Sequence, residues 1–178
     1  MAKGSSKFGK YKERKVREAL RNPINVLKSL SEKSQEKSYK YQRLYRNLYN
    51  PEFYLLAYQN IYANKGSMTP GVDGMTIDGI SMARINRIIE SMRNQSYQPK
   101  PARREYIKKK TGNKKRPLGI SSADDKLVQE VVKMILESIY EPVFKKTSHG
   151  FRPNKSCLTA LYQIQKTFTG TNWFIEGD

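Results

Sequence analysis

The sequence predicts an α+β fold that is mostly helical and contains one β-hairpin. Apolar residues recur at helical intervals in several segments, whereas strand-like character is concentrated in two short segments that flank a Gly-Asn turn. The predicted elements do not alternate between strand and helix, so the chain lacks the pattern of a parallel α/β sheet. A hydrophobic content of 37% and a mean hydropathy of −0.78 over 178 residues indicate a modest core beneath a large solvated surface.

Residues 1–49 are predicted to form a basic extension that is rich in tyrosine. Apolar residues recur there at helix-like intervals, at Val16, Leu20, Ile24, Leu27 and Leu30, and Asn22-Pro23 should break this pattern in two. Arg43 and Arg46 are interleaved with Tyr39, Tyr41, Tyr45 and Tyr49. Cations among aromatic rings suit phosphate contact combined with stacking on bases or riboses. A solvated helix whose tyrosines pack on the next domain explains the same pattern equally well.

Residues 50–171 carry most of the predicted regular structure. Asn50 and Pro51 are typical of a helix start, and one face of the helix that follows is formed by Phe53, Leu56, Ala57 and Ile61. A loop with glycine and proline spans 64–74, and an amphipathic helix over 81–94 has Ile85, Ile88, Ile89 and Met92 at its inward positions. The prolines within 97–101 favour an extended backbone.

Two strands, 104–109 and 116–121, are predicted on either side of Thr111-Gly112-Asn113, and Ser122 is expected to cap the helix that follows. That helix has one apolar stripe at Leu127, Val131, Ile135 and Ile139 and a second at Val128, Val132 and Leu136, so both stripes are expected in the core. Asp124 and Asp125 fall in its first turn, where the helix dipole favours negative charge, and this explains them better than metal chemistry does.

The C-terminal part is predicted to contain a helix over 156–168 and a buried strand over 172–178. Cys157 is expected to be a small buried residue on that helix, because a single cysteine can form no internal disulfide and supplies too few thiols for a zinc site. His149 is the one histidine in the sequence, and a structural hydrogen bond is expected of it rather than catalysis.

The formal net charge of +18 and the isoelectric point near 9.9 predict a polyanionic partner. Nucleic acid is favoured over a membrane, because no run of about 18 apolar residues is present. The first residues also lack the apolar stretch of a secretory signal, so we expect a cytoplasmic location.

Basic residues crowd the predicted hairpin, at Lys108, Lys109, Lys110, Lys114, Lys115 and Arg116. Like charges this close repel one another, so an anion is expected between or above them. A two-stranded ribbon that carries lysine and arginine suits a triphosphate or a template backbone. A loop that merely increases solubility is the alternative.

Four segments of the chain resemble successive motifs of group II intron-encoded reverse transcriptases. They are 60–74 (NIYANKGSMTPGVDG), 110–120 (KTGNKKRPLGI), 148–153 (SHGFRP) and 173–178 (WFIEGD). The order of the motifs matches that family, and they cover roughly residues 50–178. Ser121 departs from the proline that the family usually has after Gly-Ile. The resemblance implies a right-hand polymerase, of which 50–171 would be the fingers region and 172–178 the first strand of the palm.

The resemblance also implies roles for individual residues. Arg116 and Lys110 match the pair that binds the incoming triphosphate, and Asp178 matches the first catalytic ligand for Mg²⁺. The remaining cations are expected to bind nucleic acid, namely Lys65, Lys108, Lys109, Lys114, Lys115 and Arg152, together with Arg43 and Arg46 of the extension. The segment 60–74 is expected to close over template and primer.

The expected partners are group II intron RNA and template RNA, with a DNA primer and a dNTP in a longer protein. One aspartate cannot hold the two ions of a polymerase site, which are about 4 Å apart. The chain by itself is therefore expected to bind RNA without catalysing polymerisation. Its alternative function is that of a non-catalytic RNA-binding module that assists intron splicing.

Overall fold

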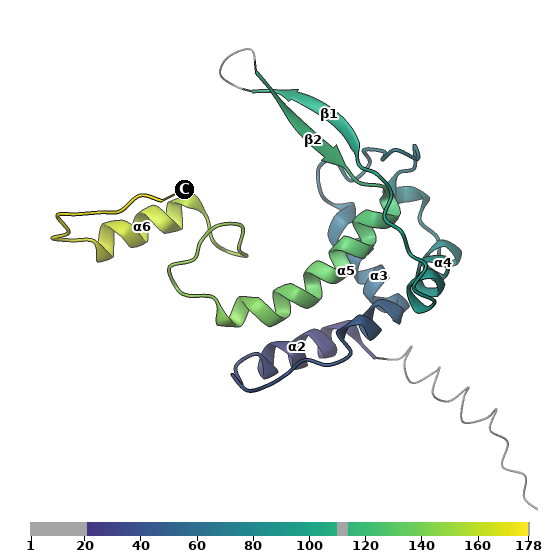
Figure 1. The fold of residues 1–178 in the computed structure, drawn as a ribbon, viewed down its shortest axis with the longest axis horizontal. Helices are drawn as coiled ribbons and strands as arrows, with labels where there is room; N and C mark the ends of the chain where they lie inside the picture. The colour runs from purple at the N-terminus through teal and green to yellow at the C-terminus, as the bar shows by residue number, and fades with distance from the viewer. Residues whose placement is uncertain (1–20, 110–113, 178) are drawn as a thin grey trace, which may run out of the picture.

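The long helix α5 (Ala123–Tyr140) is the element on which the other helices pack. The computed structural model describes residues 21–109 and 114–177, and α2 (Pro23–Lys33), α3 (Pro51–Tyr62) and the short 3₁₀ helix η1 (Leu44–Tyr49) all contact α5. Figure 1 shows α5 running diagonally between the hairpin and α2. The fold is α+β, as the sequence predicts.

The predicted helix starts are confirmed in the first half of the chain. The Asn22 side chain accepts a hydrogen bond from the Ile24 amide, and Pro23 opens α2, so a helix begins at the predicted break. Val16 and Leu20, on the other side of that break, lie outside the described residues. Asn50 caps α3 in the same way through the amide of Glu52. Ser81 caps α4 (Met82–Arg93), and the short 3₁₀ helix η2 (Ile77–Gly79) precedes it.

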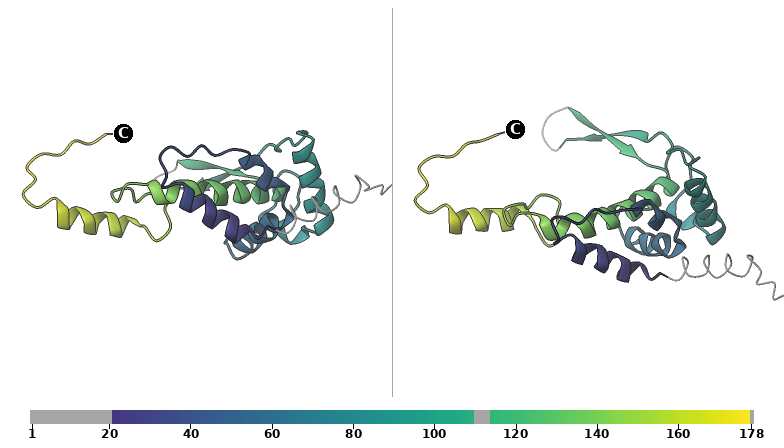
Figure 2. Two further views of the ribbon diagram at one scale, coloured as in Figure 1. Left: turned by 90° about the horizontal axis from the view of Figure 1, so that it is seen from below. Right: turned by 60° about the horizontal axis from the view of Figure 1, so that its bottom comes forward.

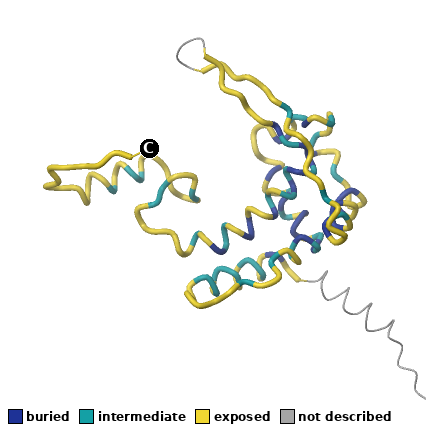
Figure 3. The backbone as a smooth tube through the Cα atoms, in the orientation of Figure 1, coloured by how far each residue is buried: buried dark blue, intermediate teal, exposed yellow. Residues whose placement is uncertain are grey.

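The core lies where α3, α4, η1, η2 and α5 meet, and Figure 3 shows its buried residues in dark blue. Phe53, Tyr54 and Ile77 are fully buried, and the predicted inward residues of α4 are also buried. The hydroxyl of Tyr54 donates to the Leu48 carbonyl, and burial raises the pKa of this phenol. The helical periodicity therefore identified most of the principal core, although Leu56 is only half-buried and the buried Tyr54 was not among the predicted residues.

The prediction that both stripes of α5 are buried is half wrong. The stripe of Leu127 and Val131 is buried, whereas Val132 and Leu136 are 36% and 44% exposed. The reason is geometric, because α2, α3 and η1 cover one side of α5 and leave the side with Val132 and Leu136 open.

The hairpin consists of β1 (Arg103–Lys108) and β2 (Lys115–Ile120), paired antiparallel in a two-stranded sheet. It projects away from the helices in Figure 1 and in the right view of Figure 2, and nearly all of it is exposed. The predicted turn residues 111–113 lie outside the described part of the chain.

The C-terminal part lies to one side of the helical core in Figures 1 and 2. After η3 (Glu141–Val143), helix α6 (Cys157–Thr167) begins with a capping box between Ser156 and Thr159. The helix was predicted, but Cys157 is exposed rather than buried, because α6 packs too loosely on the rest of the described chain to bury any of its residues.

The predicted buried strand over 172–178 is wrong for the residues that the structure describes. Residues 172–177 are neither in a strand nor buried, and Trp173, Phe174 and Ile175 are 89%, 83% and 100% exposed. In the described ranges, the β1–β2 hairpin is the whole of the sheet, so this segment has no strand to pair with. Asp178 itself lies outside the described residues.

Candidate nucleic-acid interface

The register of the hairpin sorts its side chains onto two faces. Arg116 is paired with Ile107, and Lys115 is paired with Lys108. Residues directly opposite each other share a face, and the faces alternate along each strand. Arg116 therefore shares its face with Ile120, which is buried at the base, whereas Lys108 and Lys115 lie on the other face with Arg104.

All the predicted hairpin cations that the structure describes are exposed: Lys108, Lys109, Lys114, Lys115 and Arg116. The Lys109 amide donates to the Lys114 carbonyl at 3.2 Å, so the ribbon continues one pair beyond Lys108 and Lys115. The hairpin thus gathers five of these positive charges at its outer end. Lys110 lies outside the described residues, so its predicted partnership with Arg116 stays a prediction.

The base of the hairpin is fixed to the loop of the 60–74 segment. Arg103 donates from Nε to the Pro70 carbonyl at 3.1 Å. Next to it, Gly71 is buried so closely against the start of α5 that a Cβ there would lie 2.6 Å from the Ser122 Cα. Ser122 in turn accepts the Asp125 amide at its hydroxyl and caps α5. The loop, the hairpin and the long helix therefore meet at one point.

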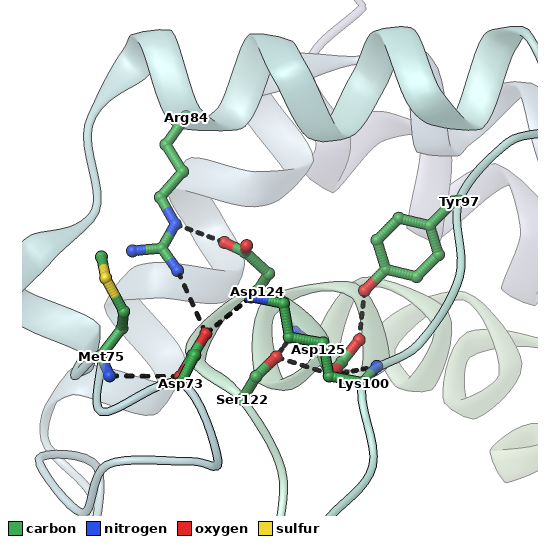
Figure 4. A network of polar contacts seen from close by, with 8 residues as sticks. All are labelled: Asp73, Met75, Arg84, Tyr97, Lys100, Ser122, Asp124 and Asp125. Atoms are coloured by element: carbon green, nitrogen blue, oxygen red, sulfur yellow. Dashed lines mark hydrogen bonds and ion pairs between the residues drawn. The ribbon is translucent and has the colours of Figure 1, made fainter.

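A buried arginine joins the same loop to α4 and α5, as Figure 4 shows. Arg84 is 7% exposed and donates from Nε to Asp124 at 2.6 Å, with Asp73 4.0 Å from its Nη2. Lys100 donates from Nζ to the same oxygen of Asp73, Oδ2, at 2.8 Å. The hydrogen bond from Lys100 is the main cause that lowers the pKa of Asp73. Both aspartates are therefore neutralised by cations from other segments.

A second contact ties the extended segment 97–101 to the first turn of α5. Asp125 is buried and accepts the Tyr97 hydroxyl, the Lys100 amide at 3.0 Å and the Ser122 hydroxyl at 2.6 Å. Burial and the carboxylate of Asp125 raise the pKa of Tyr97. Asp124 and Asp125 thus do lie in the first turn of the helix, as expected, and they also bind segments from far along the chain.

The loop of the 60–74 segment is also held by a lysine of α5. Lys126 donates from Nζ to the Thr69 carbonyl at 2.8 Å and to the Ser67 carbonyl at 3.4 Å. Burial lowers the pKa of Lys126. Lys65, predicted to bind nucleic acid, is exposed in this loop.

The tyrosines of the N-terminal extension make contacts within the chain. Tyr41 donates to the Leu30 carbonyl at 2.9 Å, and Tyr45 donates to the Met92 carbonyl at 3.2 Å. The ring of Tyr49 packs edge-on against Tyr45. These contacts favour the packing alternative for Tyr41 and Tyr45. Arg43 and Arg46 remain exposed beside them.

Arg152 has its partners inside the chain. Its side chain is 11% exposed and pairs with Glu141 at 2.7 Å, and it also donates to the Ser148 carbonyl at 2.7 Å. The guanidinium lies 4.9 Å from the centre of the Phe144 ring. The hydrogen bond from Arg152 lowers the pKa of Glu141. The arrangement closes the loop between α5 and α6, and a nucleic-acid role for Arg152 stays a prediction.

His149 also has a structural place in this loop. Its two ring nitrogens contact the Thr159 hydroxyl at 2.9 Å and the Gln163 side-chain oxygen at 2.5 Å. The ring thereby connects the 144–155 segment to α6, which agrees with the structural hydrogen bond expected from the sequence.

Within 21–109 and 114–177, no three histidine, cysteine or acidic side chains come together in a way that would hold a metal ion. These residues alone therefore do not fit a two-ion site for Mg²⁺, and Asp178 lies outside them. Nor do the described helices include one with the length and apolar character needed to cross a bilayer.

No protein-family model matches the chain. The chain is 52% identical to the group II intron-encoded protein LtrA of Lactococcus lactis subsp. cremoris over 160 residues, which are 89% of this chain and 27% of LtrA. The chain belongs to the family of group II intron-encoded proteins. Another relative is an uncharacterized 91 kDa protein in the cob intron of Schizosaccharomyces pombe. That protein is 44% identical over 89% of this chain and 20% of its own length.

A shorter match links the chain to nuclear intron maturase 2 of Arabidopsis thaliana, at 46% identity over 30% of the chain and 7% of the maturase. The chain spans about a quarter of the length of LtrA and less of the other two. The family resemblance that the sequence motifs predict is therefore confirmed.

The sequence pointed to the hairpin cations but missed the polar contacts beneath the hairpin. Arg84 looks like an exposed position of an amphipathic helix, and Asp73 and Lys100 lie in loops without any periodic signal. A charged residue among the apolar residues of α4, next to the inward Ile85, was the one available clue.

Proposed function

We propose that this chain is the fingers region of an RNA-directed DNA polymerase of the group II intron type, which binds template RNA and the triphosphate of an incoming dNTP. The observation that carries the proposal is the exposed hairpin with Lys108, Lys115 and Arg116, in a chain that is 52% identical to a group II intron-encoded protein. The longer protein would catalyse attack of a primer 3′-hydroxyl on the α-phosphate of a dNTP.

The chemistry of the two hairpin faces suits two phosphate ligands. Arginine offers a planar set of donors that fits phosphate oxygens, so Arg116 is assigned to the triphosphate, with Lys110 as its proposed partner. Lys108 and Lys115 lie on the opposite face and are assigned to the template backbone. Lys109 and Lys114 form the next pair outward, which falls on the Arg116 face, and they are assigned to nucleic acid at the outer end of the ribbon. One ribbon would thus hold the nucleotide on one side and the template on the other.

The fixed base of the hairpin supports this assignment. A phosphate-binding arm must be held in position if the nucleotide is to be oriented for attack. Arg103, Gly71 and Ser122 join the arm to α5, and Arg84 joins the same loop to α4. The exposed Lys65 in that loop is assigned to template and primer.

Asp178 is proposed as the first Mg²⁺ ligand of the longer protein. When bound, the metal would supply charge stabilisation to the attacking and leaving oxygens. The contribution of this chain is to bind and orient the substrates.

The test measures RNA binding by the whole chain. The fluorescence anisotropy of a labelled RNA stem-loop reports the affinity at each of a series of salt concentrations. A variant with glutamine at Lys108, Lys109, Lys114 and Lys115 should bind at least tenfold more weakly, with a shallower salt slope, because each phosphate contact adds roughly 0.7 to 0.9 to that slope. The control variant carries glutamine at four exposed lysines elsewhere: Lys28, Lys37, Lys146 and Lys155.

An equal loss of affinity in both variants would mean that total charge, and not the hairpin, determines binding. Absence of RNA binding by the unaltered chain would overturn the proposed function altogether.

The second candidate is a non-catalytic RNA-binding module that assists intron splicing. It is favoured by the similarity to an intron maturase and by the +18 charge of the chain. Recognition of RNA helices depends largely on shape, phosphates and 2′-hydroxyls, so no catalytic residue is needed for it. In the longer protein, Asp178→Ala should abolish DNA synthesis under the first proposal and leave RNA binding and splicing unchanged under the second.

A further inference from the structure

A pocket of about 700 Å³ lies between α2 and the segment 42–47, on the side of the core away from the hairpin base. One wall is formed by successive turns of α2, with Asn25, Ser29 and Lys33. The opposite wall is formed by Gln42 and Arg43. This volume falls within the range of small-ligand sites, which hold roughly 300–1,000 Å³.

The charges around this pocket are of one sign. Arg21, Lys33, Arg43 and Arg46 all line it, and none of its lining residues in the described part of the chain is acidic. Two of the more buried arginines elsewhere in the described ranges, Arg84 and Arg152, are by contrast paired with carboxylates. The pocket is therefore suited to an anionic ligand, which would be attracted by several cations at once.

Neutral polar groups and an apolar floor complete the lining. Within the described residues, the side chains of Asn25, Ser29 and Gln42 have no internal hydrogen-bond partner, so their amides and hydroxyl are available to a ligand. Val26 and Leu30 form part of the floor and are half-buried against the core. The apolar floor, the amides in the walls and the cations at the rim offer contacts to the base, its polar edge and the phosphates of a nucleotide.

The backbone at Arg43 is held in an uncommon conformation. Its φ of 59° and ψ of 30° lie in the left-handed region, which costs a residue with a Cβ roughly 1–2 kcal/mol. The Arg46 amide donates to the Arg43 carbonyl at 3.1 Å and so begins η1 directly after this turn. Strain of this kind is concentrated at functional sites, and here it directs the chain across the open side of α2.

We infer that this pocket binds one unpaired nucleotide of RNA. The base lies on Val26 and Leu30 with its edge toward Asn25 and Gln42, and the flanking phosphates lie at Arg43 and Arg46. Sequence-specific binding of RNA takes place mainly at single-stranded loops and bulges, whose bases are free to leave the stack. This inference rests on the proposed RNA binding, and adds a preference for an unpaired base that a surface of lysines would not have.

The test uses the whole chain and two short RNA stem-loops that differ by a single bulged 2-aminopurine. The unaltered chain should bind the bulged RNA about tenfold more tightly than the paired RNA, as expected for one base held by amide hydrogen bonds. The double variant Asn25→Ala, Gln42→Ala should lose this preference while its affinity for the paired RNA and its salt slope stay the same, because no charge is removed. Gln59→Ala, Gln165→Ala is the matched control, and it should keep the preference.

A second variant tests the cations at the rim of the pocket separately from the amides in its walls. Arg43→Asn keeps a residue that tolerates the left-handed backbone and, together with Arg46→Gln, removes two charges. It should weaken binding of both RNAs and lower the salt slope by about 1.4 to 1.8. Circular dichroism and thermal unfolding of each variant establish that it is folded, as expected since Asn25, Gln42, Arg43 and Arg46 are exposed.

Each outcome decides the matter. Equal affinity of the unaltered chain for the two RNAs would overturn the inference and leave the proposed RNA binding intact. A preference that survives in Asn25→Ala, Gln42→Ala would overturn it as well, since the bulged base would then lie elsewhere. Binding of neither RNA would count against the proposed function from which the inference starts.

Discussion

Lys108 and Lys115 lie directly opposite each other across the β-hairpin, on one face of the ribbon. Side chains in such a position have their Cβ atoms about 5 Å apart, and two like charges there destabilise the pair. A sheet with no ligand for this face gains nothing from the arrangement. The pair therefore identifies a place where binding an anion offsets a cost in the free protein.

The first prediction concerns stability in the absence of RNA. Lys115→Thr should raise the free energy of unfolding by about 0.5 kcal/mol, because it removes the repulsion and places a β-branched residue in a strand. The gain should shrink at high salt, where the repulsion is screened. Urea unfolding at low and high salt measures both effects. Lys146→Thr, at an exposed loop position, is the control. An equal gain in that variant would show that repulsion between Lys108 and Lys115 is not the cause.

The second prediction distinguishes the two faces of the hairpin. Arg116→Ala should lower the affinity for a fluorescent dNTP analogue by roughly tenfold or more, since a charge-assisted hydrogen bond contributes about 1.5–3 kcal/mol. Arg104→Ala removes an exposed arginine from the opposite face and should leave that affinity within about twofold. Anisotropy titrations of both variants make the comparison. Identical losses would show that the triphosphate does not distinguish the faces.

The third prediction concerns the arginine beneath the hairpin. Arg84→Ala should lower the free energy of unfolding by about 3 kcal/mol, because Asp73 and Asp124 would lose a buried cationic partner. Arg87→Ala, at an exposed position about one turn further along the same helix, should change it by less than about 0.5 kcal/mol. Urea midpoints with unchanged slopes give the two values. Equal midpoints for the two variants would mean that the ion pairs contribute nothing net.

The fourth prediction concerns acid stability. The pKa of Asp73 is lowered in the folded chain, chiefly by the hydrogen bond from Lys100, so its stabilising effect is present above the unfolded carboxyl pKa of about 4. That effect is lost as the pH falls through the lower, folded value. The difference in melting temperature between the unaltered chain and Asp73→Asn should therefore shrink as the pH is lowered from 6 toward 3.

The control for acid stability is Glu36→Gln, an exposed carboxylate without an ion pair among the described residues. Its melting temperature should follow that of the unaltered chain at every pH. A constant difference for Asp73→Asn across the same range would contradict the assignment of the Lys100 hydrogen bond.

The sequence predicts those parts of this fold that depend on local periodicity. Asn22, Asn50, Ser81 and Ser122 cap helices where their residue types and the following apolar patterns indicate. The hairpin is found because its two strands lie next to each other along the chain. In each case the signal and its cause are within a few residues of each other.

The parts that the sequence does not predict depend on which segments meet in space. Val131 and Val132 both belong to apolar stripes of α5. Only the positions of α2 and α3 decide that Val131 is buried and Val132 is exposed. Arg84 and Asp124 are 40 residues apart, and nothing local to either residue indicates the pairing. The segment 172–177 has the residues of a strand but, in the described chain, no partner strand.

Gly71 makes one position of the 64–74 loop far less tolerant of substitution than the other two glycines there. The close approach of Ser122 leaves no room for a Cβ, whereas Gly66 and Gly74 have positive φ values and no close obstruction. In a library randomised over 64–74 and selected for a folded chain, positions 66 and 74 should accept asparagine, which tolerates that backbone. Position 71 should return glycine alone, because alanine would push the loop away from α5 and move the hairpin with it.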